Sequence, residues 1–390
     1  MAICKAVPPA ASPITALNLV NGLTALCGGT DECRTFAADI CRVFGVDYCF
    51  LLSTGTAGLS LLLRALKRIH PGKTEVVIPA FTCNSIPSAV AHEGLTCRLC
   101  DVNPSTLDYD YDRFPECLRE SDHILCVIVP HLFGLPADIE RASAIAHSHG
   151  LAVIEDAAQA FGNEIRGKKL GTQGDAGLFS FGKSKALSTY EGGIIVTNNA
   201  VIGEHIAQIA LSLPTYSITE TARLICGALA YASLLHPRVF WLPRGIPYLR
   251  LGRVTRFQPE FVPARMTPFQ AGLARGWERK IEHLRSVRRT NALKWAAVCG
   301  RKHYHTNLLV NESKCGPVRF PLLAESRMIR NRIIAEGVMW GAGVTYRVIR
   351  KKPGLALTEN PDCYRGALTL EHRLLGLPTH PFAAIQKYWG

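Results

Sequence analysis

The sequence predicts an α/β protein built around a mostly parallel β-sheet. Short apolar runs typical of buried strands alternate with helical patterns from Asp31 to Thr197, as expected for βαβ crossovers. The chain has 390 residues, of which 48% are hydrophobic and 19% are charged. This length and composition can bury a large core and leave room for two domains. We therefore expect no extensive disorder.

The first elements surround a turn of small residues. A helical pattern begins at residues 30–31 and ends at Gly45, because glycine suits the left-handed end of a helix. Residues 48–52 predict a strand, and residues 53–58, STGTAG, form a turn before the next helix. Apolar residues lie on one face of that helix: Leu59, Leu62, Leu63, Leu66 and Ile69. Free N–H groups at its start suit a phosphate, although such a turn is more often only a tight connection.

The strands expected next are short and apolar. A helical pattern separates two of them and runs from Asp138 to about Gly150. The last segment, Asp175–Asn198, holds two apolar runs with Ser180 and Lys185 between them. The earlier strands are expected at residues 75–79, 96–102, 123–134 and 151–154.

Residues 201–262 interrupt this alternation. Residues 224–235 are apolar and helical but too short to cross a bilayer, and aromatic and basic residues follow. We interpret the segment as an insertion packed on the domain or at a subunit contact; a membrane-facing surface over residues 222–256 is the second interpretation. We expect a large domain over residues 1–262 and a smaller α+β domain over residues 263–390.

The smaller domain should begin with a long helix over residues 265–296. A strand is expected around residues 344–346, and the tail from Leu368 predicts a strand, a turn and a helix.

Charge and cysteine content limit the partners and the compartment. The net charge of +13 suits an anionic surface or a phosphorylated substrate, and no nucleic-acid-binding motif accompanies it, so we expect no nucleic acid partner. The 14 cysteines are scattered among apolar runs, as in reduced cytosolic proteins, and the CxxC at residues 97–100 has no second pair, so we expect no metal. Residues 8–29 weakly resemble a signal peptide, but prolines and asparagines interrupt them; we expect a cytoplasmic protein.

A lysine and an aspartate give the first indication of chemistry. Asp156 follows the predicted strand 151–154, and ligands of α/β sheets bind at the carboxyl ends of strands. A carboxylate there can pair with the pyridinium nitrogen of pyridoxal phosphate, and Lys185 can hold the aldehyde of that cofactor as a Schiff base. The alternative is that Asp156 caps a helix and Lys185 forms a surface ion pair.

Taken together, the motifs resemble the DegT-like family of pyridoxal-phosphate-dependent aminotransferases, which are best known for acting on nucleotide-linked keto sugars. Blocks similar to the family occur in family order from about Gly28 to Pro381. They are STGTAGLSLLL, VVIPAFTCNSIPSAV, CDVNPSTLDYD, PHLFGLPADIE, VIEDAAQAFG, GDAGLFSFGKSKAL, EGGIIVTN, ARMTPFQAGLARGWERKIE and RLLGLPTHP.

The resemblance implies an aspartate-aminotransferase-like fold of type I. This fold has a mostly parallel seven-stranded sheet between helices, a smaller C-terminal α+β domain, and a homodimer with active sites near the subunit boundary. The resemblance also implies that Lys185 is the catalytic lysine. The other implied cofactor contacts are Thr56, Ala57 and Ser180 at the phosphate, Asp156 at the pyridinium nitrogen, and Gln159 at the ring hydroxyl.

Lys183 competes with Lys185 for the catalytic role. Family spacing places the reactive lysine directly after Ser or Thr and five residues past the phosphate-binding serine, which selects Lys185. Dehydratase relatives carry histidine there, and cysteine desulfurases of this fold usually place histidine where this chain has Ser184. The lysine therefore favours transamination.

Three features depart from the family pattern. Relatives often stack an aromatic residue on the cofactor ring at the position of Cys83, so stacking here is thinner or comes from Phe81 or His131. Pro263 stands where relatives often have a phosphate-binding asparagine, and the insertion is longer than in compact members. Candidate substrate contacts are His131, Arg347 and His380, each of which could equally be structural.

By family analogy, glutamate is the expected amino donor and a nucleotide-linked keto sugar the expected carbonyl acceptor. One alternative is another pyridoxal-phosphate enzyme of this fold that acts on a non-sugar or lipid-linked substrate. The other is a non-catalytic scaffold or regulator that has kept the fold.

Overall fold

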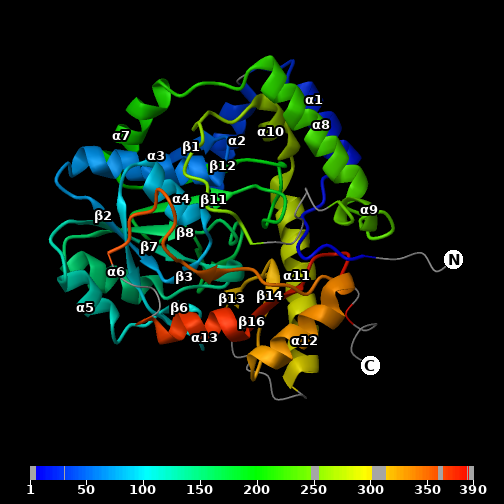
Figure 1. Ribbon diagram of the computed structural model, residues 1–390. Helices are drawn as coiled ribbons and strands as arrows, with labels where there is room; N and C mark the ends of the chain where they lie inside the picture. The colour runs from blue at the N-terminus through cyan, green and yellow to red at the C-terminus, as the bar shows by residue number, and fades with distance from the viewer. Residues whose placement is uncertain are drawn as a thin grey trace.

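A seven-stranded sheet forms the centre of the computed structural model (Figure 1). The structure describes residues 6–29, 31–246, 254–300, 313–358, 363–383 and 385. The strands, in spatial order, are β1 (Tyr48–Leu52), β12 (Gly193–Thr197), β11 (Ala176–Ser180), β8 (Ala152–Asp156), β7 (Ile124–Pro130), β2 (Glu75–Pro79) and β4 (Thr96–Cys100).

The sheet is mostly parallel, which confirms the predicted fold class. Strands β11, β8, β7, β2 and β4 pair in parallel, whereas β12 runs antiparallel to both β1 and β11. The expected alternation of strands and helices up to Thr197 is wrong at its last two steps, because no helix lies between β8 and β11 or between β11 and β12. The connection over residues 181–192 is a loop, so β12 turns back beside β11. This loop carries Lys185.

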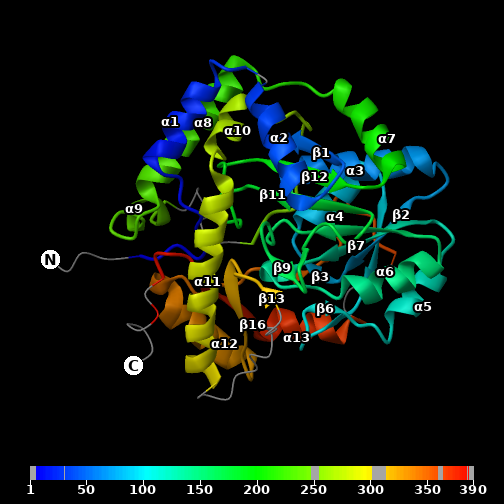
Figure 2. The same cartoon turned by 180° about the vertical axis from the view of Figure 1, so that it is seen from behind.

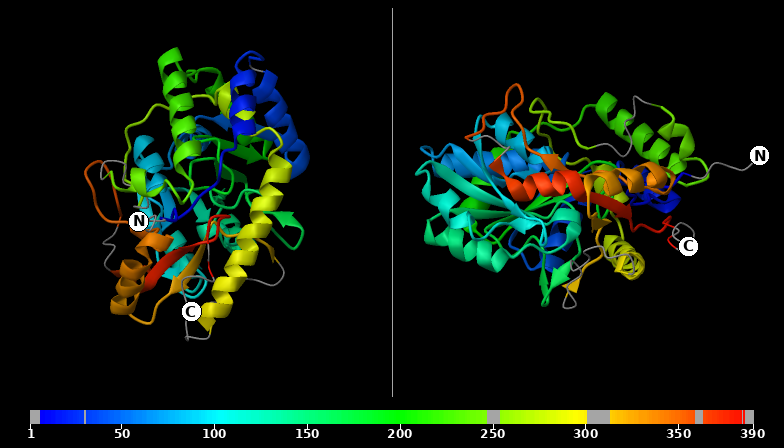
Figure 3. Two further views of the ribbon diagram at one scale, coloured as in Figure 1. Left: turned by 90° about the vertical axis from the view of Figure 1, so that its right-hand side faces the viewer. Right: turned by 60° about the horizontal axis from the view of Figure 1, so that its bottom comes forward.

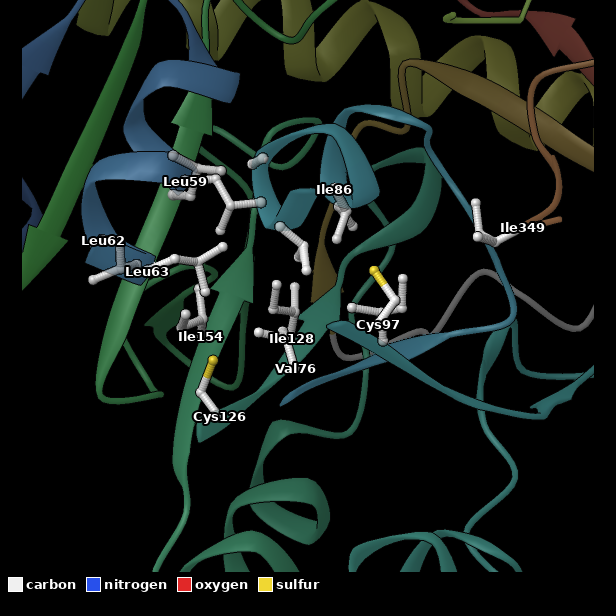
Figure 4. Close-up of a cluster of buried hydrophobic side chains, with 14 of the residues drawn as sticks. Leu59, Leu62, Leu63, Val76, Ile86, Cys97, Cys126, Ile128, Ile154 and Ile349 are labelled. Carbon is white, nitrogen blue, oxygen red and sulfur yellow. The ribbon is translucent and has the colours of Figure 1, made fainter. Parts of the chain in front are cut away.

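Helices cover both faces of the sheet. One face packs against α3 (Gly55–Ile69), α4 (Ser85–His92) and α7 (Ala200–Leu211). Figure 4 shows this core, in which Leu59, Leu62 and Leu63 of α3 lie near Ile128 and Ile154 of the strands. The other face packs against α2 (Asp31–Phe44), α5 (Phe114–Arg119) and α6 (Ile139–Ser148). Burial on both faces explains why these strands appear as continuous apolar runs.

The CxxC cysteines lie on β4 but face different cores. Cys97 packs in the cluster under α3 and α4, and Cys100 packs in the cluster under α5 and α6. Their side chains therefore point to opposite sides of the sheet, as expected for residues three apart in a strand.

A group of helices packs beside the edge strand β1. It consists of α1 (Ala16–Ala25), α8 (Ile218–Leu234), α9 (Trp241–Arg244) and α10 (Pro268–Leu273) (Figure 2). Leu224 of α8 and Phe269 of α10 share one buried cluster with Ile14. The stretch that weakly resembles a signal peptide is thus a packed helix here. Within the described residues, no helix has the length and apolar character needed to span a bilayer.

The C-terminal part is connected by the long helix α11 (Trp277–Gly300), which runs alongside it (Figure 3, left). Its elements are β14 (Arg319–Leu323), α12 (Arg327–Gly337), β15 (Arg347–Val348), α13 (Arg365–Arg373) and β16 (Leu374–Pro378). Short elements complete the fold: β3 (Phe81–Thr82), β5 (Val102–Asn103), β6 (Asp108–Tyr109), η1 (Leu132–Gly134), β9 (Glu164–Ile165), β10 (Lys168–Lys169), β13 (Ser313–Lys314) and η3 (Val338–Trp340).

Two predictions for this part are wrong. The helix expected over residues 265–296 is split into α10 and α11 at Gly276, which has a φ of +70°. The tail begins with helix α13 rather than a strand, because Ala367 and Leu370 are buried one helical turn apart. Strand β16 follows, and the helix expected beyond it falls mostly on residues 386–390, outside the described residues. The domain boundary at residue 263 remains a prediction, and α10 packs against α1 and α2 of the large unit.

Candidate active site

The candidate site lies at the carboxyl ends of β1, β11 and β8. Strand β12 is antiparallel to both β1 and β11, so β1 and β11 point the same way, and β8 is parallel to β11. Their carboxyl ends therefore meet at one edge of the sheet. Ser180 and Asp156 close β11 and β8, and the turn before α3 follows β1. This is the edge at which open α/β sheets bind ligands.

Asp156 provides a half-buried carboxylate at this edge. Its Oδ1 accepts a hydrogen bond from the Ala158 N–H at 3.0 Å, and its main-chain carbonyl accepts one from the His131 N–H at 3.0 Å. Burial raises the pKa of Asp156, and the positive charge of Lys185 partly offsets that effect. The carboxylate thus lies close enough to Lys185 to interact with its charge, and it would gain from a further hydrogen-bond donor.

The two neighbouring lysines point in different directions. Lys183 is exposed, and its Nζ lies 4.0 Å from the ring centroid of Tyr190 and 4.0 Å from a carboxylate oxygen of Glu191. Lys185 is half-buried, and its N–H donates to the Gly182 carbonyl at 3.1 Å in a tight turn. Of the two lysines, Lys185 is the one whose charge acts on Asp156. The geometry therefore favours Lys185 over Lys183.

A buried arginine binds the main chain of the lysine loop, residues 181–192. Arg288 of α11 is 1% exposed and donates to the carbonyl of Ala186 at 2.6 Å and to that of Lys185 at 3.3 Å. It also donates to the Ala11 carbonyl at 3.2 Å, which ties the N-terminal segment to the loop. The Tyr231 hydroxyl of α8 donates to the Lys183 carbonyl. We did not predict these anchors, because basic residues in the run SVRRTN suggest a solvent-facing helix surface.

The start of α3 lies tightly against Ser180. A methyl group placed on Gly55 would lie 2.7 Å from the Ser180 Cβ and 3.0 Å from its Oγ. The close packing places the N-terminal end of α3 beside the Ser180 hydroxyl, and the positive end of the helix dipole favours an anion there. The Ala57 N–H, however, donates to the N-cap hydroxyl of Thr54 at 3.0 Å. A phosphate contact of Ala57, as predicted, would have to share this N–H with the Thr54 hydroxyl. Thr56, the other predicted contact, is half-buried in the first turn of α3.

Gln159 and Cys83 bring further groups towards Asp156. The Tyr346 hydroxyl donates to Gln159 Oε1 at 2.5 Å, and Tyr346 lies close enough to Cys83 and Asp156 to interact with both. Cys83 is half-buried, with its Sγ 3.3 Å from the Ser85 hydroxyl. Phe81 is buried, and the centroid of its ring lies 6.0 Å from the centroid of the Tyr346 ring. Tyr346 was not among the predicted site residues.

The three candidate substrate contacts occupy different settings. His131 is fully buried: its Nδ1 accepts from the Ala137 N–H at 3.0 Å, so its Nε2 is the nitrogen that donates to Glu155 at 2.8 Å. His380 is also buried, and its Nε2 donates to the Pro8 carbonyl at 2.7 Å. These bonds favour the structural alternative for both histidines. Arg347 is exposed on β15 opposite Thr82, beside Cys83, and stays a candidate.

Glu155 supports the same edge from inside the sheet. Its carboxylate accepts hydrogen bonds from the N–H groups of Gly171 at 2.7 Å and Gly174 at 2.6 Å, besides that from His131. Burial alone would raise the pKa of Glu155, but these donors outweigh it and the pKa is lowered. The ionised, fully paired glutamate thus fixes the loop that follows β8.

The fold and the lysine-bearing edge define an aspartate-aminotransferase-like protein of fold type I. The chain belongs to the DegT/DnrJ/EryC1/StrS aminotransferase family, whose sequence profile matches residues 20–222.

Among curated relatives, it is similar to the UDP-N-acetyl-3-dehydro-alpha-D-glucosamine 3-aminotransferase of Acidithiobacillus ferrooxidans. The two are 40% identical over 149 residues, which cover 38% of this chain and 39% of that protein. It also resembles a pleiotropic regulatory protein of Geobacillus stearothermophilus, with 33% identity over 189 residues, 48% of this chain and 50% of that one. The matched stretch thus spans half or less of each relative.

Among solved structures, the fold is similar to the putative sugar aminotransferase Spr1654 from Streptococcus pneumoniae in its PMP form. The TM-score is 0.78 at 18% identity, and the match covers 98% of this chain and 97% of that one. At this identity the likeness establishes the fold.

Proposed function

We propose that this chain is a pyridoxal-5′-phosphate-dependent aminotransferase. It moves an amino group from an amino acid, expected to be glutamate, to a carbonyl acceptor, expected to be a nucleotide-linked keto sugar. The observation that carries this proposal is that Lys185 lies close enough to Asp156 for its charge to act on that carboxylate, at the edge where Ser180 meets the start of α3. The names of the sugar aminotransferases that it resembles support the acceptor class.

The residues at this edge fit the proposed cofactor in their chemistry. The start of α3 lies directly against Ser180, and a helix start with a hydroxyl beside it suits a phosphate. Asp156, whose pKa is raised by burial, gains a partner if a pyridinium N–H lies against it. Lys185 supplies the amine, and the Gln159 amide supplies a donor for the ring hydroxyl.

Each side chain then has a defined task. A bound cofactor would supply an electron sink for the reaction at the donor carbon. Lys185 would hold the cofactor through its Nζ, and the same amine would carry the proton that leaves the donor carbon. Asp156 keeps a proton on the ring nitrogen, while Arg288 keeps the lysine loop in register by binding the Lys185 and Ala186 carbonyls.

Two half-reactions test this proposal. Purified protein is loaded with pyridoxal phosphate, and glutamate should then bleach the visible band of the lysine-bound cofactor. The bleached protein is next offered UDP- and GDP-linked keto sugars, free keto sugars and simple 2-oxo acids. Return of the band with a nucleotide-linked keto sugar is the expected result. Return only with a non-sugar carbonyl compound would move the proposal to the alternative acceptor class.

A non-catalytic regulator is the second candidate, because one relative is named a pleiotropic regulatory protein. The same first step separates the two functions. A folded protein that gains no visible band with excess pyridoxal phosphate would favour the regulator, whereas a band that glutamate bleaches excludes an idle site.

We also propose that the partner of this chain is a second copy of itself. The support is family membership, together with four apolar side chains on the outer face of α1 that are 39–68% exposed: Leu17, Val20, Leu23 and Leu26. Light scattering should give twice the mass of one chain. Val20→Glu places a charge in the middle of this apolar face, so the variant should give a lower mass.

Membrane contact through residues 222–256 is the competing use of this side of the molecule. Trp241, Leu242 and Ile246 are exposed there, and residues 247–253 lie outside the described residues. Co-sedimentation with anionic liposomes would support membrane contact, and a protein that stays in the supernatant would contradict it. We also propose a cytoplasmic location, because the cysteines are scattered among apolar runs rather than placed at disulfide-framework spacings.

A further inference from the structure

Tyr346 reaches the candidate site from the C-terminal part of the chain. It directly precedes β15, which pairs with β3 so that Arg347 lies opposite Thr82 and Val348 opposite Phe81. This pairing delivers Tyr346 to the space next to Cys83, where it is 4% exposed. A tyrosine far along the chain thus becomes part of the wall of the site.

The hydrogen bond of the Tyr346 hydroxyl to Gln159 has a fixed direction. An amide oxygen can only accept a hydrogen bond. The Tyr346 hydroxyl therefore donates its proton to Gln159 Oε1 at 2.5 Å. The amide oxygen of Gln159 is thereby turned towards Tyr346. Its NH2 group is left for a partner on the other side.

The surroundings of Tyr346 are rigid. The rings of Phe133 and Phe81 lie edge-on to it, at centroid distances of 5.2 Å and 6.0 Å. Phe133 has a φ of +62°, which is uncommon for a residue with a side chain. Burial raises the pKa of Tyr346 well above its usual value, so the hydroxyl keeps its proton at working pH.

We propose that Tyr346 is a positioning residue that holds the Gln159 amide with its NH2 group towards the ring hydroxyl of the bound cofactor. This inference rests on the proposed function, because it needs a cofactor with a ring oxygen. A donor at that oxygen favours its ionised form, so the Gln159 NH2 should lower the pKa at which the visible band of the lysine-bound cofactor titrates. Tyr346 sets this pKa through Gln159 without touching the cofactor.

The first test is the variant Tyr346→Phe, which removes only the hydroxyl. The Gln159 amide loses its fixed direction, so the affinity for pyridoxal phosphate should fall about 10-fold and the band should titrate at higher pH. Equilibrium dialysis gives the affinity, and an absorbance titration gives the pKa. Thermal unfolding of the cofactor-free protein separates these effects from a loss of stability.

A double-mutant cycle distinguishes positioning from a merely structural role. Gln159→Ala should change the affinity and the band pKa as Tyr346→Phe does, and adding Tyr346→Phe to Gln159→Ala should change neither further. Effects of the two substitutions that simply add would overturn the inference. If the wild type binds no cofactor at all, the proposed function fails instead.

Two controls complete the design. Tyr109 is also buried, and its hydroxyl donates to the Ile128 carbonyl at 2.7 Å, so Tyr109→Phe should lower stability and leave the band pKa unchanged. Gln159→Glu keeps an acceptor for Tyr346 but has no NH2 group. It should fold like the wild type and still lose affinity, which keeps the inference testable if Tyr346→Phe does not fold.

Discussion

The guanidinium of Arg288 donates to the main-chain carbonyl of Lys185 at 3.3 Å, and these two residues are 103 positions apart in the chain. The same guanidinium binds the carbonyls of Ala186 and Ala11. A buried cation therefore joins the long helix α11, the N-terminal segment and the lysine loop. The loop owes its position to contacts that form only in the complete fold.

Arg288→Met should destabilise the protein strongly. The substitution keeps an unbranched side chain but removes three hydrogen bonds to main-chain carbonyls, so the free energy of unfolding should fall by about 3 kcal/mol. Urea denaturation of the cofactor-free protein measures the loss. Lys294→Met on the same helix is the control, because Lys294 is exposed and the change should stay within about 0.5 kcal/mol. Equal losses for both variants would contradict the anchoring role.

Gly55→Ala tests whether the start of α3 and the Ser180 hydroxyl together bind the cofactor phosphate. The new methyl group would lie 2.7 Å from the Ser180 Cβ, so the helix start and Ser180 must move apart. We expect a loss of about 1–3 kcal/mol in the free energy of unfolding and weaker binding of pyridoxal phosphate. Gly72→Ala is the matched control, since a methyl group there meets no atom within 4 Å. Unchanged cofactor affinity in Gly55→Ala would show that the start of α3 does not bind the phosphate.

Asp156→Asn should separate function from stability. Burial raises the pKa of Asp156 in the folded chain, so its ionised form costs stability once the pH exceeds the unfolded pKa. The neutral amide avoids that cost, and the cofactor-free variant should be at least as stable as the wild type at pH 7. Transamination should fall on the order of 100-fold, because the ring nitrogen loses its charged partner. A less stable apo-variant with full activity would contradict both expectations.

His380 makes the stability depend on pH. Burial lowers its pKa from 6.5 to about 4, with Arg288 and Arg319 adding to the effect. The unfolded chain therefore binds the proton first, so this stabilisation is complete above pH 6.5 and is lost as the pH falls towards 4. The full shift corresponds to roughly 3 kcal/mol. Unfolding measured from pH 7 to pH 4 should show a shallower loss in His380→Gln, and parallel curves would contradict the assignment.

Much of the fold was predictable because its signals are local. Apolar runs such as ILCVIV form strands buried on both faces, and Gly45 ends α2 with a φ of +66° as expected. The expected seven-stranded fold is confirmed. The antiparallel direction of β12 could not be predicted, because it depends on how the loop carrying Lys185 turns rather than on the strand itself.

The sequence suggested only the part of the candidate site that carries the lysine. Lys185, Asp156 and Ser180 lie at strand ends or on the adjoining loop, where sequence order alone suggests chemistry. Tyr346 and Gln159 are 187 positions apart, and neither local sequence predicts the hydrogen bond between them. His131 shows the converse problem, because the sequence cannot reveal that Glu155 and the Ala137 N–H already occupy its ring nitrogens.

The most direct test of the central claim is to find which amine carries the cofactor. The protein is incubated with pyridoxal phosphate and treated with borohydride, which makes the lysine–cofactor bond permanent, and the labelled peptide is identified by mass spectrometry. The label should lie on Lys185 and be absent from Lys185→Ala, while Lys183→Ala should label as the wild type does. A label on Lys183, or labelling that survives Lys185→Ala at the same site, would contradict the account.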